Sequence, residues 1–122
     1  MKLLFTIKMP IPPLALRPNG RPHWAVKAKA SRIQRTEAKL RTLQVSRKLD
    51  LTGEKVLHIK NTWFKKTKTR MDGDNASASL KAARDGIAEA LGVNDSIFVN
   101  WPTKFEVDKE NPRVMIEVYI DN

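Results

Sequence analysis

The last stretch of the chain, residues 113–120, constrains the fold most strongly. Apolar side chains occupy every second position: Val114, Ile116, Val118 and Ile120. Successive side chains of a β-strand point to opposite faces, so this alternation predicts a strand with one face buried and the other open to solvent. A strand of this kind belongs to a sheet that is covered on one side.

Other segments show what accompanies that strand. The apolar run 3–9 predicts a first strand, which prolines end, and a long loop follows over residues 10–24. Residues 25–48 lack Gly and Pro and are rich in helix-favouring residues, which predicts a long helix. Residues 55–64 predict a strand through their β-branched and aromatic content. Residues 76–91 predict a helix, since apolar residues recur at steps of three and four: Leu80, Ala83, Ile87 and Leu91.

With a closing strand expected over residues 96–101, the chain is predicted to be one small α+β domain spanning residues 1–122. We expect a mixed sheet of about four strands with two helices packed on it. On the middle strand, Leu57, Ile59 and Trp63 share one face and are expected in the core. On the long helix, the expected packed stripe is Val26, Ala30, Ile33 and Leu40, with Leu43 close beside it.

The net charge of +10 indicates a polyanionic partner, and nucleic acid is the first candidate. Up to residue 70 the chain has 18 Lys and Arg against 3 acids, and after residue 70 it has 5 against 10. An enzyme that brings a metal ion to a phosphate needs both kinds of charge. A solvated basic face with an unrelated acidic face is the alternative interpretation.

Several classes of site are excluded or disfavoured by composition. Without cysteine there is no disulfide, thiolate metal site or cysteine nucleophile, and His23 and His58 are too few for a zinc site on their own. Nothing resembles a signal peptide or a membrane span, so a cytoplasmic protein without membrane contact is expected.

Acidic residues concentrate in the motif Arg70-Met71-Asp72-Gly73-Asp74-Asn75. In an extended segment Asp72 and Asp74 leave the backbone on the same face, so their carboxylates can converge. Hard oxygen ligands of this kind suit Mg²⁺. The alternative is a simple turn, because Asp, Gly and Asn favour turns for backbone reasons.

A basic run leads into the motif, and we expect it to bind phosphate together with two loop arginines. The run is Lys65, Lys66, Lys68 and Arg70, and the loop arginines are Arg17 and Arg21.

Two further acids follow the motif. Asp85 lies four residues after Lys81, so both share one helix face and an ordinary surface ion pair is one interpretation. Asp95 follows the same helix in a turn-like segment and is expected to bring a third carboxylate back towards Asp72 and Asp74.

The order of these motifs resembles the RusA family of Holliday-junction resolvases, small Mg²⁺-dependent nucleases of bacteria and their phages. The resemblance spans nearly the whole chain and is most specific in residues 70–75, 81–86 and 92–96. It implies a RusA-like nuclease domain that cuts four-way DNA junctions in recombination and repair, with Mg²⁺ as the cofactor and Mn²⁺ as a possible substitute.

By the same resemblance, Asp72, Asp74 and Asp95 are the metal ligands and Lys81 is the catalytic lysine. Asn75 matches the family asparagine after the pair, and Asp85 matches a further acidic helix position. Asp85 could bind the metal or orient Lys81, and we place it, like Asn75, in a supporting position next to the ligands. Two departures stand out. Lys81 lies seven residues after Asp74, which is longer than the shortest family spacing, and Asn94 stands where the family often carries an additional acid.

Two other functions remain open. One is a non-catalytic nucleic-acid-binding module whose acids are turn and cap residues, and the other is a metal-dependent nuclease of different DNA specificity. Junction resolution needs two nicks, so we expect a homodimer with twofold symmetry. Its interface is placed among Val114, Ile116 and Val118 of the last strand and the neighbouring sheet.

Overall fold

The computed structural model describes residues 1–18 and 23–122, and within them five strands form one mixed sheet. The strands are β1 (Lys2–Met9), β2 (Leu57–Lys65), β3 (Phe98–Asn100), β4 (Lys104–Val107) and β5 (Arg113–Ile120). β5 lies between β1 and β2 and is antiparallel to both. β3 and β4 pair in parallel with successive parts of β2.

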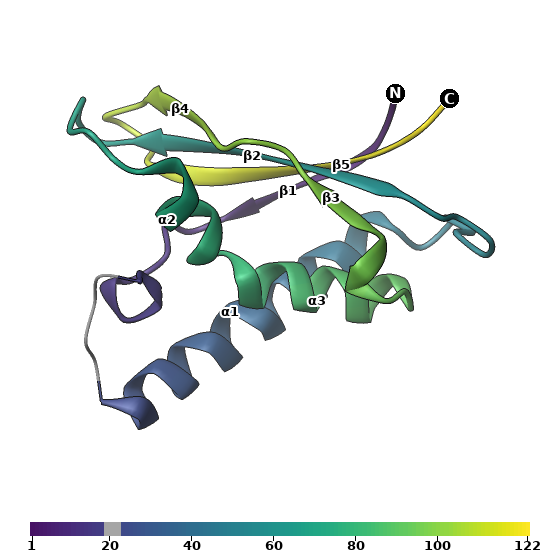
Figure 1. Ribbon diagram of the computed structural model, residues 1–122, viewed down its shortest axis with the longest axis horizontal. Coiled ribbons are helices and arrows are strands. Elements are labelled where there is room, and N and C mark those ends of the chain that lie inside the picture. Colours follow the sequence, from purple (N-terminus) through teal and green to yellow (C-terminus); the bar gives the residue numbers. More distant parts are fainter. Residues whose placement is uncertain (19–22) are drawn as a thin grey trace.

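The helices lie together on one face of this sheet (Figure 1). They are α1 (Trp24–Val45), α2 (Gly73–Ala78) and α3 (Lys81–Leu91), and two short 3₁₀ helices, η1 (Leu14–Leu16) and η2 (Asp95–Ile97), connect them to the strands. The α+β class and the mixed sheet are therefore confirmed. Within the described residues the sheet has one strand more than expected, β4, and the second predicted helix is divided into α2 and α3.

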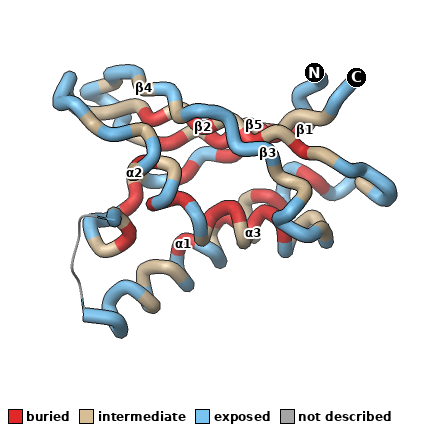
Figure 2. Tube along the Cα trace, viewed as in Figure 1, coloured by how far each residue is buried: buried red, intermediate tan, exposed pale blue. Residues whose placement is uncertain are grey.

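The core lies between the sheet and the helices, where Figure 2 shows the buried segments. Val114, Ile116 and Val118 of β5 are fully buried, as the alternation predicted. Leu57 and Ile59 of β2 are also fully buried, and Trp63 is 1% exposed. The dimer interface predicted on Val114, Ile116 and Val118 is wrong, because these side chains face the protein's own core and are unavailable to a partner.

The buried face of α1 also differs from the prediction. Its apolar residues Val26, Ile33 and Leu40 are more than half exposed, with exposures of 55%, 57% and 54%. Ala30 is half-buried and Leu43 is exposed. The residues of α1 that are buried are Gln34, Ala38 and Thr42.

Close packing of α1 against α3 explains this choice of face. A Cβ added to Gly86 of α3 would lie 2.2 Å from the carbonyl oxygen of Arg35, so only glycine allows the two backbones to approach this closely. Such a contact leaves room for small side chains, among them Ala38, Thr42 and Ala83, and the larger apolar residues of α1 are turned outward. Backbone distance, which the apolar pattern of one helix does not encode, selected the buried face.

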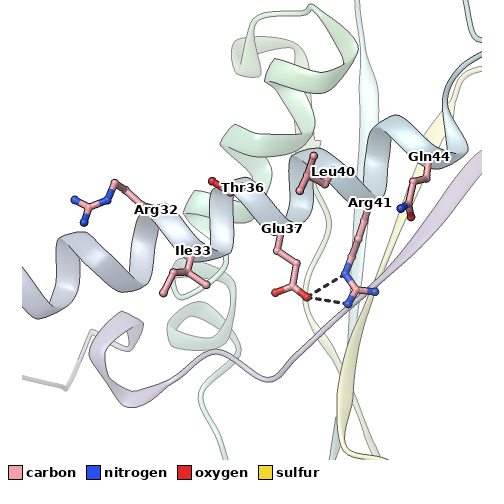
Figure 3. Close-up of a pocket in the computed structure, with 7 residues that line it drawn as sticks. All are labelled: Arg32, Ile33, Thr36, Glu37, Leu40, Arg41 and Gln44. Atoms are coloured by element: carbon pink, nitrogen blue, oxygen red, sulfur yellow. Dashed lines mark hydrogen bonds and ion pairs between the residues drawn. The ribbon is translucent and has the colours of Figure 1, made fainter.

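The outer face of α1 carries a hollow of about 760 Å³ (Figure 3). Glu37 and Arg41 form an ion pair across it, with the Arg41 Nη2 nitrogen 2.8 Å from the Glu37 Oε1 oxygen. Ile33 and Leu40 are its exposed apolar residues. This surface is therefore amphipathic and lies outside the protein's own core.

The break between α2 and α3 is stabilised by a side chain of α1 and by one of its own residues. Gln34 of α1 donates to the Ser79 carbonyl oxygen at 2.9 Å and accepts from the Ala83 N–H at 2.8 Å. The Ser79 hydroxyl donates to the Ala76 carbonyl oxygen at 2.6 Å. The ends of helices leave backbone groups unpaired, and these bonds satisfy several of them at the junction. The position of α3, and with it Lys81, is therefore tied to α1.

Other boundaries shifted by a few residues. Residues 95–97 form η2 and the strand β3 starts at Phe98, whereas the expected strand covered 96–101. No helix among the described residues is long and apolar enough to cross a membrane.

Candidate functional site

Asp72 and Asp74 lie at the start of α2 and not in the extended segment that was expected. Asp72 is the residue that caps this helix, and its Oδ1 oxygen accepts from the N–H groups of Asp74 and Asn75 at 2.8 and 3.1 Å. Such caps stabilise a helix by about 0.5–2 kcal/mol. Asp74 sits in the first helical turn and is exposed. The motif therefore begins a helix and is not a simple turn, and the Asp72 carboxylate has the structural role of a cap, as the non-catalytic alternative expected.

The donor set at the start of α2 still suits Mg²⁺ in kind. Asp72 uses one carboxylate oxygen for both backbone hydrogen bonds, and within the described residues the Asp74 carboxylate makes no hydrogen bond or ion pair. Mg²⁺ commonly takes only one or two carboxylates and completes its shell with water and substrate oxygens. The described part of the chain contains no group of three His, Cys, Asp or Glu placed to hold a metal ion. The expected gathering of Asp95 with Asp72 and Asp74 is therefore not observed.

Asp95 instead contacts Lys81 and Asp85. The Lys81 Nζ nitrogen lies 2.6 Å from Asp85 Oδ1 and 3.4 Å from Asp95 Oδ2. The start of α3 supplies Lys81 and its next turn supplies Asp85, while η2 supplies Asp95. Two turns bring η2 back: Gly92 adopts a left-handed conformation with φ +69°, and the Asn94 side chain accepts from the Ser96 N–H at 2.8 Å.

The Lys81 cluster, defined as Lys81, Asp85 and Asp95, keeps its lysine protonated. The hydrogen bond to Asp85 is the largest cause that raises the pKa of Lys81, and the charge of Asp85 and the contact with Asp95 add to it, while partial burial opposes them. Lys81 therefore acts as a fixed positive charge and is not suited to accept a proton. A positive charge placed this way can bind a phosphate oxygen or stabilise the charge that develops on one.

A hollow of about 470 Å³ joins the α2 start to two of the predicted DNA-binding arginines. It is lined by Arg17 and Arg70 together with Asp72 and Asn75, and by the neighbouring residues Leu14, Pro18 and Met71. Arg17 comes from the N-terminal loop and Arg70 from the segment after β2, so the fold brings distant parts of the sequence together here. We call this hollow the arginine–aspartate hollow.

Arg17 makes two contacts that position its guanidinium group. Its Nη2 nitrogen donates to the Pro12 carbonyl oxygen at 3.3 Å, and its guanidinium carbon lies 6.0 Å from the centre of the Trp63 ring. Arg70 is exposed. Of the other predicted contacts, Arg21 lies outside the described residues.

The basic run begins at the last residue of β2, and some of its side chains make contacts while others are exposed. Lys65 donates to the Thr69 carbonyl oxygen, and its Nζ nitrogen lies 5.1 Å from the centre of the Phe105 ring. Lys66 and Lys68 are exposed. The run therefore presents exposed cations at the edge of the same region as Arg70.

Two buried polar residues near the site, Gln34 and Arg84, were not predicted from the sequence. Gln34 fixes the α2–α3 junction, and Arg84 is 9% exposed and donates to the Ser77 carbonyl oxygen at 2.9 Å. Both sit in helices whose apolar pattern gave no reason to expect buried polar side chains. Their burial depends on the α1–α3 contact, so no local signal marks them.

Comparison with known proteins places the chain beside a protein of unknown role. No family model matches the sequence. An uncharacterised protein of Xylella fastidiosa is 34% identical over 103 residues, which cover 84% of this chain and 67% of that protein. Among solved structures, the periplasmic domain of Helicobacter pylori MotB aligns with 100% of this chain and 84% of the MotB chain, at 19% sequence identity and a TM-score of 0.42. This similarity is too low to support a comparison of function.

Proposed function

The chain belongs to the same protein family as the uncharacterised Xylella fastidiosa protein, and we propose that it is a magnesium-dependent DNA endonuclease that resolves four-way junctions. The observation that carries the proposal is the arginine–aspartate hollow, which sets Arg17 and Arg70 beside Asp72 and Asn75. A passive binder of nucleic acid has no need of a carboxylate where its arginines meet phosphate. A hydrolase needs both, because cations bind the phosphate and carboxylates bind the metal ion.

In this proposal Asp72 and Asp74 would hold Mg²⁺, with Asn75 beside them. When bound, the ion supplies an activated water and neutralises charge on the phosphate and the leaving oxygen. Arg17 and Arg70 bind the backbone and fix its position. Mn²⁺, which takes similar oxygen ligands, is expected to substitute.

Lys81 is proposed to stabilise the charge that develops on the phosphate during cleavage. Asp85 orients it through the 2.6 Å contact. Asp95 acts through Lys81 and not as a third metal ligand, because it contacts Lys81 and does not join Asp72 and Asp74.

The exposed Lys66 and Lys68, with Lys65, extend the phosphate-binding surface from Arg70.

A homodimer in the cytoplasm of a bacterial or phage-infected cell completes the proposal. Resolution needs two paired nicks, and one chain offers a single set of these residues, so two copies must face the junction together. With the β5 residues buried, the exposed Ile33 and Leu40 on the outer face of α1 offer an apolar surface for this contact. Sedimentation at micromolar concentration should give twice the 13.9 kDa chain mass, and Ile33→Glu with Leu40→Glu should give the mass of one chain.

One specific observation favours the non-catalytic alternative. Asp72 caps α2 through two backbone hydrogen bonds, so this acid has a purpose without a metal ion. In that case the protein would bind nucleic acid and cut nothing.

The test is cleavage of a synthetic four-way junction, a duplex and a single strand of matched sequence, with Mg²⁺ and with EDTA. Cutting of the junction alone, dependent on Mg²⁺, is the expected result. In the variant Asp72→Asn this cutting should be lost. Asp50→Asn is its matched control, because Asp50 also accepts a local backbone hydrogen bond, from Thr52 N–H at 2.9 Å, and lies outside the proposed site. Equal cutting of all three substrates would favour a nuclease of other specificity, and binding without cutting would favour the passive module.

A further inference from the structure

A second hollow, of about 570 Å³, lies between α1, α3 and the segment around η1. Its polar and charged lining residues come from both helices and from the junction between α2 and α3, which supplies Ser79. Those from the helices are Lys27, Ser31, Gln34, Lys81, Arg84 and Asp85. Leu16 and Pro18 close it on the side of η1. We call it the α1–α3 hollow.

Arg84 is the unusual member of this lining. It is a charged side chain with only 9% exposure, and within the described residues no carboxylate lies at ion-pair distance from it. Its Nη1 nitrogen donates to the Ser77 carbonyl oxygen at 2.9 Å and to the Ser77 hydroxyl at 3.4 Å. The four residues outside the description, 19–22, include no acid in their sequence.

A buried charge without a counter-ion is costly. The pKa of Arg84 is lowered, and burial is the largest cause. The nearby negative charges of Asp85 and Asp95 act in the opposite direction and raise this pKa. No Arg84 nitrogen belongs to the enclosed polar atoms that lack a partner, so its remaining N–H groups keep contact with solvent. An anion in the hollow would supply a counter-charge at contact distance and would replace solvent as the hydrogen-bond acceptor of those N–H groups.

The rest of the lining favours an anion as well. Lys27 and Lys81 add two positive charges, and the carboxylate of Asp85 is engaged by Lys81 at 2.6 Å. The hollow therefore has an excess of positive charge, and Ser31 offers a hydroxyl donor. A guanidinium, an ammonium and a hydroxyl together form a donor set that matches the oxygens of a phosphate.

We propose that the α1–α3 hollow binds a phosphate group of a nucleic-acid strand through Arg84, Lys27 and Ser31. The proposal rests on the proposed function and names the path of the strand. Pro18 borders both this hollow and the arginine–aspartate hollow, so the two lie on either side of the same turn of chain. A strand held by Arg17 and Arg70 continues past Pro18 to Lys81 and Arg84.

The first experiment uses two neighbouring lysines of α1. Lys27 lines the hollow, whereas Lys29 is an exposed lysine of the same helix that does not line it. Binding of a labelled four-way junction is measured by fluorescence anisotropy over a range of salt concentrations in EDTA. Lys27→Ala should reduce the slope of log K against log salt by about 0.9, the value for one lost phosphate contact on B-DNA, and Lys29→Ala should leave it unchanged. Equal changes in both variants would overturn the proposal.

The second experiment probes Arg84 directly with inorganic phosphate. Phosphate should raise the melting temperature of the wild-type protein above that in chloride of equal ionic strength, because a ligand of the folded state stabilises it. Arg84→Met keeps the volume of the side chain and removes the charge, so this variant should fold and lose the phosphate-specific shift. Ser31→Ala, a small change in the same hollow, should reduce the shift. A shift that survives in Arg84→Met would overturn the assignment.

The outcomes separate this proposal from the proposed function. Neither measurement requires cleavage, so a protein that cuts nothing but shows the Lys27 effect retains the phosphate site and loses only the nuclease activity. A protein that cuts junctions with an unchanged Lys27 slope keeps its activity and loses this strand path. A phosphate shift without any binding of DNA would contradict the nucleic-acid assignment of the hollow.

Discussion

The starts of α2 and α3 present acidic residues in opposite ways. At the α2 start, the Asp72 carboxylate accepts hydrogen bonds from the backbone of Asp74 and Asn75, so its contacts are local in sequence. At the α3 start, Asp85 and Asp95 bond to the side chain of Lys81, and Asp95 is 14 residues away from it. The first arrangement needs only a short stretch of chain, whereas the second exists only after η2 has folded back against α3.

The two starts are also separated in space. The six residues of α2 extend about 9 Å at a rise of about 1.5 Å per residue. Asp72 and Lys81 therefore belong to different turns of the helical segment, and the Lys81 cluster does not share the arginine–aspartate hollow. The predicted catalytic lysine therefore takes its ion-pair partners from its own helix and from η2, and not from the acids that precede it in the motif.

The largest expected effect comes from the α2 start. Asp74→Asn removes a carboxylate that has no structural bond within the described residues, so cleavage of the junction should be lost while binding stays equal or becomes tighter, since repulsion of phosphate falls. Cleavage assays with saturating Mg²⁺ and anisotropy in EDTA measure the two effects. Cleavage near the wild-type rate would remove the metal role from this acid and leave α2 with a purely structural start.

At the α3 start, Lys81→Ala should lower the single-turnover cleavage rate by about 100-fold and change binding much less, because loss of one preorganised charge acts on the transition state. A lysine that serves only as an ion-pair partner contributes about 0.2–0.5 kcal/mol and would leave the rate almost unchanged. Lys39→Ala is a control, since Lys39 forms a comparable surface ion pair with Glu89 at 3.0 Å. A drop below about threefold would assign Lys81 to structure alone.

A third prediction separates the two starts through the helix contact. Gly86→Ala places a Cβ against the Arg35 carbonyl oxygen, so α3 must shift relative to α1. Overpacking of this kind costs about 1–3 kcal/mol, which denaturant unfolding can measure. The Lys81 cluster should be disturbed, whereas the Asp72 cap, being local, should persist. A stability equal to wild type would show that the helices do not approach this closely.

Asp72 itself allows a smaller and sharper test. Asparagine caps helices about as well as aspartate, whereas alanine does not, so Asp72→Ala should be less stable than Asp72→Asn by about 1 kcal/mol. Both variants should lose cleavage if the carboxylate also holds Mg²⁺. Thermal unfolding and cleavage assays on the pair therefore divide the structural role of Asp72 from its proposed catalytic one. Full activity in Asp72→Asn would leave only the cap.

The smallest effect concerns pH. Because the folded-state pKa of Lys81 is raised, its ion pairs contribute stability fully below the unfolded-state pKa and lose it as the pH rises through the folded-state pKa. The Lys81 side chain is 62% exposed, so solvent screens this contribution. The wild-type protein and Lys81→Arg should show parallel stability profiles around neutral pH and diverge only in the alkaline range. Divergence near neutrality would contradict a protonated lysine.

Much of the sheet could be predicted because a strand's pattern is local. The alternation of residues 113–120 identified β5, its bounds and its buried side, since the side-chain period of two needs no knowledge of the partner strand. The same holds for the buried set Leu57, Ile59 and Trp63 on β2. The interface placed on β5 was wrong because alternation shows that a face is buried and does not show whether its own helices or another chain cover it.

The helices were less predictable. The apolar stripe of α1 had the expected period, yet the protein buries Ala38 and Thr42, because Gly86 lets α3 approach so closely that small residues fit best. It also buries Gln34, which bonds to the junction between α2 and α3. The division into α2 and α3 likewise depends on Gln34, a residue 45 positions away from Ser79. Neither feature has a signal within the helix that it changes.

The sequence by itself therefore determined the α+β class, the strand β5, the separation of basic and acidic halves, and the residue types available to bind phosphate or a metal ion. The tertiary structure decided which of those residues meet. It set Arg17 and Arg70 in one hollow with Asp72, brought Asp95 to Lys81, and placed the buried Arg84 and Lys27 in another hollow. The physical reason is that propensity, alternation and charge are properties of neighbouring residues, whereas these meetings depend on how closely α1 and α3 pack and on where η1 and η2 return the chain.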